Sequence, residues 1–157
     1  MATLPSFSAV LASPIGKLGI VVRNEALARL AFLPSSTDIC PAQDDCAKEV
    51  VDGLMHYFHN PHYTFTLNLH LIGTPFQKSV WEQLQRIPSG KTLSYGELAK
   101  QLQTSPRAIG NACRANPIPV VVPCHRIVAA NHIGGFAGQT TGQLLDMKTW
   151  LINHEAI

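Results

Sequence analysis

The run Pro123-Cys124-His125-Arg126 has the residue types needed for nucleophilic chemistry. A cysteine reacts as its thiolate, and cationic neighbours such as His125 and Arg126 lower the pKa of a thiol. Most free cysteines are instead inert residues of a protein interior. The proline, histidine and arginine around Cys124, placed directly after the hydrophobic residues 120–122, predict a reactive nucleophile.

His125 is the base nearest to Cys124 in the sequence. Because neighbouring side chains of a helix or strand point in different directions, we expect His125 to take the thiol proton through one water molecule. A catalytic base is usually oriented by a third group, commonly a carboxylate. The last predicted helix offers Asp146 and Glu155 for this role.

The remaining motifs with possible chemistry are cysteines and histidines of the first half. Cys40 and Cys46 have no context like that of Cys124, so we expect them to be structural. Since nothing else suggests secretion, reduced thiols are favoured over disulfides. His56, His59 and His62 could join these cysteines in a zinc site, but the spacings match no standard zinc pattern. We therefore expect no metal.

Three helices are predicted between residue 74 and Cys124. The first begins with a capping box and a proline at its first position and ends at residues 88–90. The second runs to about residue 102 and the third from about 107 to 115, and this pair has the helix-turn-helix pattern. The predicted N-caps are Thr74, Ser94 and Ser105.

Cys124 is predicted to follow a short buried strand at residues 120–122. A glycine-rich loop at 134–138 and a helix from about 141 to 155 come after it. In the first half, residues 15–22 and 28–33 predict strands joined by a turn near residues 23–25. Residues 46–58 predict a helix, and the alternation in residues 64–71 predicts a strand with one buried face.

The composition favours a folded protein that is not embedded in a membrane. Of the 157 residues, 46% are hydrophobic and 14% are charged, which is typical of a packed core. No apolar run reaches the ~18 residues that a membrane span needs, and no secretory signal is evident, so we expect a cytoplasmic protein.

The charge is unevenly distributed along the chain. The net charge of +2 is by itself no sign of nucleic-acid binding. Residues 38–52, however, hold five acidic side chains and one lysine, whereas residues 78–126 hold seven basic and two acidic ones. We therefore expect the positive surface on the second half.

Residues 116–128 closely resemble the active-site block of the O6-alkylguanine-DNA alkyltransferases. Residues 73–77, Val80-Trp81, 87–92, 94–99, 107–112 and Lys148-x-Trp150-Leu151-x-x-x-Glu155 also resemble blocks of this family. The resemblance is highly specific over residues 73–157. Over residues 1–72 it is weak and depends mainly on the strand pattern.

The resemblance implies a mixed α/β fold with two domains. Residues 1–72 would form a small ribonuclease-H-like α/β domain that gives structural support. Residues 73–157 would form a winged helix-turn-helix-like domain that binds DNA and carries out the transfer.

The implied activity is a single-turnover repair reaction. The alkyl group of O6-alkylguanine, and of O4-alkylthymine, would move from DNA to Cys124, and nothing would regenerate the stable thioether. The lesion is inaccessible inside the duplex, so the base must be flipped out, at a cost of a few kcal/mol. The implied partner is double-stranded DNA approached from the minor groove. The protein would be a monomer, and it would need no cofactor.

The resemblance also implies a role for each matching site residue. Cys124 would accept the alkyl group, His125 would take its proton through a water, Glu155 would hold His125, and Asn116 would brace the turn. The implied base-binding residues are Tyr95, which donates to N3 of guanine, Ile127, whose carbonyl accepts from the exocyclic amine, and Gly138, whose amide donates to O6. The implied DNA-binding residues are Arg107, which fills the gap left by the base, and Ala112, Cys113 and Arg114 of the recognition helix.

Some questions stay open at the level of sequence. Residues 139–143 make the connection from the loop to the last helix longer than is common in the family, which leaves the range of accepted adducts open.

Rival interpretations are a lesion-binding protein without transfer activity, a helix-turn-helix regulator and a cysteine hydrolase. Lesion binders of this type carry tryptophan in place of the cysteine, so Cys124 argues against the first.

Overall fold

The computed structural model describes residues 7–130, 134 and 142–156. The chain divides into two compact units, Met1–Leu71 and Ile72–Ile157. Gly138 and most of the predicted glycine-rich loop lie outside the described residues. Among the described helices, none has the length and apolar character needed to cross a membrane.

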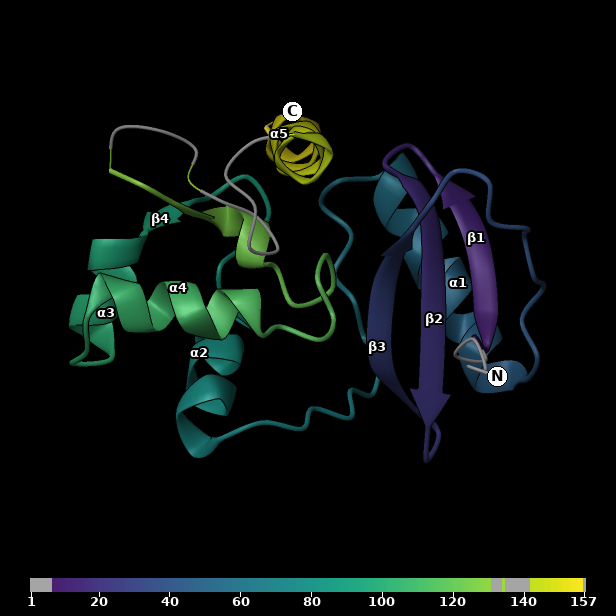
Figure 1. Cartoon of the computed structure of the whole chain (residues 1–157), viewed down its shortest axis with the longest axis horizontal. Coiled ribbons are helices and arrows are strands. Elements are labelled where there is room, and N and C mark those ends of the chain that lie inside the picture. Colours follow the sequence, from purple (N-terminus) through teal and green to yellow (C-terminus); the bar gives the residue numbers. More distant parts are fainter. Residues whose placement is uncertain (1–6, 131–133, 135–141, 157) are drawn as a thin grey trace. The chain divides into compact units, whose positions relative to one another are not determined.

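The first unit is a three-stranded antiparallel sheet with one helix packed on it (Figure 1). The strands are β1 (Ala9–Ser13), β2 (Gly16–Arg23) and β3 (Ala26–Leu33), in the order β1-β2-β3, and the helix is α1 (Asp45–His59). The predictions for residues 15–22, 28–33 and 46–58 are confirmed, whereas β1 was not predicted. The predicted turn is confirmed too, because Asn24 and Glu25 both have positive φ angles, 53° and 60°, as a tight hairpin turn requires.

The predicted strand over residues 64–71 is wrong. Only one isolated bridge joins this segment to β3, between Leu27 and Leu69. The Leu27 amide donates to the Asn68 carbonyl at 2.9 Å, and the His70 amide donates to the Leu27 carbonyl at 2.8 Å. The side chains do alternate between half-buried and exposed over residues 63–69. Alternating burial of side chains indicates an extended segment with one buried face. It does not show that another strand lies beside that segment to form a hydrogen-bonded ladder.

The second unit consists of helices and a pair of very short strands (Figure 1). The helices are α2 (Pro75–Gln85), α3 (Tyr95–Gln101), α4 (Pro106–Arg114) and α5 (Gln143–Glu155). The strands β4 (Leu93–Ser94) and β5 (Ile127–Val128) are parallel. All three predicted N-caps are confirmed, and Thr74 and Ser94 form complete capping boxes.

The interior of the second unit fixes the position of α4. Trp81 of α2 is 1% exposed, and its indole Nε1 donates to the Ala112 carbonyl at 2.9 Å. Ile109 of α4 and Leu98 of α3 are fully buried. Burial of side chains this large contributes about 1.5–3 kcal/mol each, so α2, α3 and α4 form one packed body.

Residues 120–122 are buried as predicted, but they form a turn and not a strand. The Val122 amide donates back to the Ile118 carbonyl at 2.9 Å, and Val120 has a φ of 74°. Pro117, Pro119 and Pro123 lack amide protons and cannot take part in a strand ladder as donors. The hydrophobic run therefore fills the core as a compact turn that leads into Cys124.

Candidate active site

Cys124 begins a short 3₁₀ turn, η1 (Cys124–Arg126), and its side chain is buried. Its amide donates to the Val122 carbonyl at 2.8 Å. Asn116 holds the same segment, because its Nδ2 donates to the Val122 carbonyl at 2.8 Å and its Oδ1 accepts from the Ile118 amide at 2.9 Å. The side chain of Asn116 therefore ties together the two ends of the turn that presents Cys124.

His125 is fully buried and lies against Glu155 of α5. The distance between His125 Nε2 and Glu155 Oε2 is 2.7 Å. Of the two carboxylates that the sequence offered, Asp146 is exposed in the first turn of α5. The structure therefore brings Glu155 to the histidine.

Arg126 contacts the same carboxylate from the other side. Its Nε donates to Glu155 Oε1 at 2.8 Å and its Nη2 donates to Glu155 Oε2 at 3.0 Å, while its Nη1 donates to the Ile87 carbonyl. Paired hydrogen bonds of this kind are the strong form of the arginine–carboxylate interaction. A role for Arg126 in holding the carboxylate was not part of the sequence-based prediction.

The Glu155 contact determines which nitrogen of His125 carries the proton. An ionised carboxylate only accepts hydrogen bonds, so Nε2 must donate to it. Burial lowers the pKa of His125, although Glu155 opposes that shift, so the imidazole is neutral at pH 7. Nδ1 then carries a lone pair, and it is buried with no hydrogen-bond partner among the described residues. This lone pair can act as a base.

The thiol of Cys124 is held in its protonated form by its surroundings. Burial raises its pKa above the ordinary value, while a hydrogen bond from Asn116 and the charge of Lys148 lower it. Because desolvation is the largest of these effects, the thiol needs a base to become a thiolate.

Lys148 is a second functional candidate that the sequence analysis did not single out. Its side chain is fully buried, and its Nζ donates to the Ile127 carbonyl at 2.7 Å. Burial lowers its pKa to about 8, against the opposing influence of Cys124 and Cys113. The spacing of Lys148, Leu151 and Glu155 along one face of α5 was the available signal, since all three are buried.

Tyr95 is brought to this region by the pairing of β4 with β5. Ser94 pairs with Val128, so Tyr95, the next residue, begins α3 beside the end of β5. The Nζ of Lys148 lies 5.9 Å from the centre of the Tyr95 ring. A Cβ at Gly134 would lie 3.3 Å from the Tyr95 hydroxyl, and this glycine has a φ of +79°. The backbone at Gly134 therefore passes close to the hydroxyl.

The other predicted residues lie on α4 or outside the described part of the chain. Arg107 and Arg114 are exposed on α4, Cys113 is half-buried, and burial raises its pKa. Ala112 is only 2% exposed and contacts the core through its carbonyl. Gly138 is outside the described residues.

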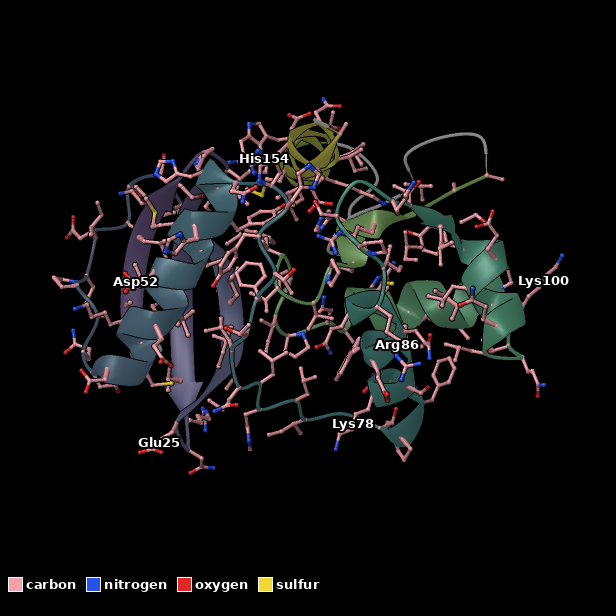
Figure 2. All side chains as sticks on the ribbon, turned by 180° about the vertical axis from the view of Figure 1, so that it is seen from behind. Glu25, Asp52, Lys78, Arg86, Lys100 and His154 are labelled. Atoms are coloured by element: carbon pink, nitrogen blue, oxygen red, sulfur yellow. The ribbon has the colours of Figure 1, made fainter. Side chains whose placement is uncertain are left out.

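Exposed basic side chains elsewhere on this unit include Lys78 and Arg86 of the α2 segment and Lys100 of α3 (Figure 2). Within the described ranges, no three histidine, cysteine, aspartate or glutamate side chains come together as a metal-binding cluster. The site therefore combines a thiol, a neutral base and charged side chains. Its residues are Cys124, His125, Glu155, Asn116, Arg126 and Lys148.

Comparison with known proteins shows which family this chain belongs to. Residues 75–157 match the family described as 6-O-methylguanine DNA methyltransferase, DNA binding domain. A methylated-DNA–protein-cysteine methyltransferase of Methanosarcina mazei is 38% identical over 93% of this chain and 94% of the relative. The crystal structure of Mycobacterium tuberculosis O6-methylguanine methyltransferase superimposes with a TM-score of 0.77 at 33% identity, covering 94% of this chain and 90% of that one.

A further solved structure shows the Mycobacterium tuberculosis protein OGT in complex with DNA. It is 34% identical to this chain, has a TM-score of 0.78, and the match covers 93% of this chain and 90% of that one. The mixed α/β architecture with a small antiparallel sheet is therefore that of these proteins. With a matching family description over half of its length and a relative that spans nearly all of it, this chain belongs to the methylated-DNA–protein-cysteine methyltransferase family.

Proposed function

We propose that this chain repairs alkylated DNA by moving the alkyl group of O6-alkylguanine, and of O4-alkylthymine, to the Sγ atom of Cys124. The observation that carries the proposal is the buried Cys124 followed by a His125 whose Nε2 lies 2.7 Å from Glu155. This is the nucleophile, base and orienting group that thiol chemistry needs. The names of the relatives give methylated DNA and a protein cysteine as the reactants.

The first step is removal of the thiol proton. The proton passes from Cys124 through one water to the Nδ1 lone pair of His125, and the histidine becomes positively charged. The Glu155 carboxylate stabilises that charge through the existing hydrogen bond to Nε2. A fixed charge in a buried site acts more strongly than it would in water.

The second step is displacement at the alkyl carbon. The Cys124 thiolate forms a bond to that carbon while the bond from carbon to O6 of guanine breaks, and the electron pair moves onto the base. The Tyr95 hydroxyl donates a hydrogen bond to N3 of the guanine and stabilises the negative charge. Because the thioether is stable, each molecule acts once. No cofactor takes part in the proposed steps.

Backbone groups recognise the flipped base. The carbonyls of Cys124 and Ile127 accept from the exocyclic amine of guanine, and the Gly138 amide donates to O6. A carbonyl oxygen has two lone pairs, so the hydrogen bond from Lys148 to the Ile127 carbonyl leaves one for the base.

DNA is bound through α3 and α4 acting as a winged helix-turn-helix, with α4 as the recognition helix in the minor groove. Arg107 fills the gap that the flipped nucleotide leaves in the stack, and Arg114 adds positive charge. The small residues Ala112 and Cys113 let the helix approach the DNA closely. Residues 1–72 serve as a ribonuclease-H-like structural support, and the protein acts as a cytoplasmic monomer.

The test is a transfer assay with a duplex that contains one O6-methylguanine. Wild type should gain the mass of one methyl group on Cys124, with a plateau at one group per protein molecule. Cys124→Ala should gain none, whereas the control Cys40→Ala should behave as wild type.

Other results would contradict the proposal. Demethylation by Cys124→Ala would exclude Cys124 as the acceptor. Tight binding to the lesion without a gain in mass would indicate a lesion-binding protein. Sequence-specific binding to undamaged DNA would indicate a regulator, and repeated cleavage of an ester or peptide would indicate a hydrolase.

A further inference from the structure

Arg126 lies at the junction of three elements of the second unit. It belongs to η1, it hydrogen-bonds to both carboxylate oxygens of Glu155 at the end of α5, and it donates to the Ile87 carbonyl just after α2. Its side chain is 11% exposed and that of Glu155 is 3% exposed. Anchoring at Ile87 holds the guanidinium in place independently of the carboxylate.

The end of α5 is held closely from a second direction. A Cβ at Gly90 would lie 3.0 Å from the Glu155 carbonyl oxygen, and Gly90 has a φ of +87°. A Cβ at this position would be in unusually tight contact with that backbone oxygen, so the turn at residues 88–90 and the last turn of α5 pack closely. The backbone that carries the Glu155 side chain is therefore held in place, and the carboxylate is held by its hydrogen bonds to His125 and Arg126.

A buried carboxylate needs a permanent positive partner if it is to stay ionised. His125 cannot be that partner at rest, because it is neutral until it takes up a proton. Arginine stays charged at all accessible pH values, and its planar fork matches a carboxylate. Arg126 therefore supplies the charge that keeps Glu155 an acceptor, and Glu155 in turn keeps the proton of His125 on Nε2.

We propose that Arg126 is a positioning residue for the transfer reaction: its guanidinium fork holds Glu155 ionised and oriented, and so keeps the Nδ1 lone pair of His125 available as the base. The inference rests on the proposed function. Arg126 itself contacts neither the thiol nor the base in this scheme, and it acts through Glu155 and His125.

The effect of removing Arg126 on the pH profile follows from the charges around His125. Besides burial, the groups that act on its pKa are Glu155, which raises it, and Arg126 and Lys148, which lower it. Without Arg126, the Glu155 carboxylate can be balanced within this pair only by a protonated His125, so the pKa of His125 rises. As the pH is lowered, His125 of the variant then becomes protonated at a higher pH than in wild type. The acidic limb of the rate profile therefore shifts to higher pH.

The experiment is single-turnover transfer from methylguanine DNA between pH 5 and 9. Three variants are compared with wild type: Arg126→Met, Arg126→Lys and the exposed control Arg86→Met, whose guanidinium pairs with Glu82 at the surface. Loss of the hydrogen-bonding partner of a metal-ligating histidine typically costs about 10–100-fold, and we use the same range for this histidine. We expect Arg126→Met to be slower by that factor with its acidic limb at higher pH, and Arg126→Lys to lie in between. The control should match wild type.

Circular dichroism and DNA binding in a Cys124→Ala background separate this effect from loss of fold or of affinity. If Arg126→Met does not fold, Arg126→Lys carries the test. Wild-type rates in either Arg126 variant overturn the inference, as does a slower Arg126→Met with an unshifted acidic limb. Failure of wild type itself to transfer would overturn the proposed function instead.

Discussion

At the scale of single residues, the site combines the thiol of Cys124 with two buried basic side chains, His125 and Lys148, whose pKa values are lowered by burial. Cys124, His125 and Glu155 were proposed from the sequence because they fall in a motif or on a helix near its end, and the structure places Glu155 against His125. Arg126 was expected only to lower the pKa of the thiol, and Lys148 was given no role, because the partners seen in the structure lie far away in the sequence: Ile87 for Arg126 and Ile127 for Lys148. Spacing along one helix shows a shared face, but it does not show which distant carbonyl that face meets.

The buried Lys148 gives a prediction about stability and pH. Its pKa is about 8 in the folded protein and 10.5 in its ordinary state, so the unfolded chain binds more protons between these values. The folded state therefore gains stability as pH rises from about 8 to 10.5. We expect wild type to gain stability relative to Lys148→Met over this range, measured as the difference between their urea midpoints.

The cysteines oppose this trend, because burial raises the pKa values of Cys113 and Cys124. Both proteins carry these thiols, so most of their effect cancels in the difference. A difference between wild type and Lys148→Met that stays constant from pH 7 to 10 would contradict a buried, titrating lysine.

At the scale of elements, the sequence predicted what local rules determine. The helices were found because their caps and apolar stripes lie within a few residues of each other, and the hairpin turn was found for the same reason. Residues 64–71 and 120–122 were assigned as strands because burial was read correctly and pairing was assumed. Pairing depends on where another strand ends, which no local pattern contains.

The cap of α4 provides a test at this scale. The Ser105 hydroxyl accepts from the Ala108 amide at 3.2 Å, and removing such a cap costs about 0.5–2 kcal/mol. We expect Ser105→Ala to lower the free energy of unfolding by about that amount in a denaturant titration. The control is Ser36→Ala, an exposed serine outside any helix or strand, which should change little. Equal effects of the two substitutions would show that the cap is not holding α4.

At the scale of the whole molecule, we expect the uneven distribution of charged residues to affect the affinity for DNA. Arg107 and Arg114 are exposed on α4, whereas Arg29 is an exposed arginine on β3 of the first unit. Each phosphate contact contributes about −0.9 to the slope of log K against log salt concentration.

We expect Arg114→Ala to weaken binding to any duplex and to reduce that slope by about 0.9 if the side chain contacts a phosphate. Arg107→Ala should instead weaken binding mainly to DNA with a flipped base. Titrations at several salt concentrations measure both effects, with Arg29→Ala as the control. A larger loss from Arg29→Ala would place the DNA on a different surface.

The burial of Cys124 has a consequence for how long the protein stays active before it meets a lesion. Under the proposed function, Cys124 reacts only once and must stay unreacted until a lesion is bound, and this residue is 6% exposed. Cys40 and Cys46 are half-exposed, so a bulky thiol reagent should label them before Cys124, as peptide mass mapping would show. Faster labelling of Cys124 would contradict this. Burial makes the thiol depend on a base, and it also limits contact of the thiol with oxidants and with alkylating agents in solution. Under the proposed function, the single reaction of each molecule is therefore kept for DNA.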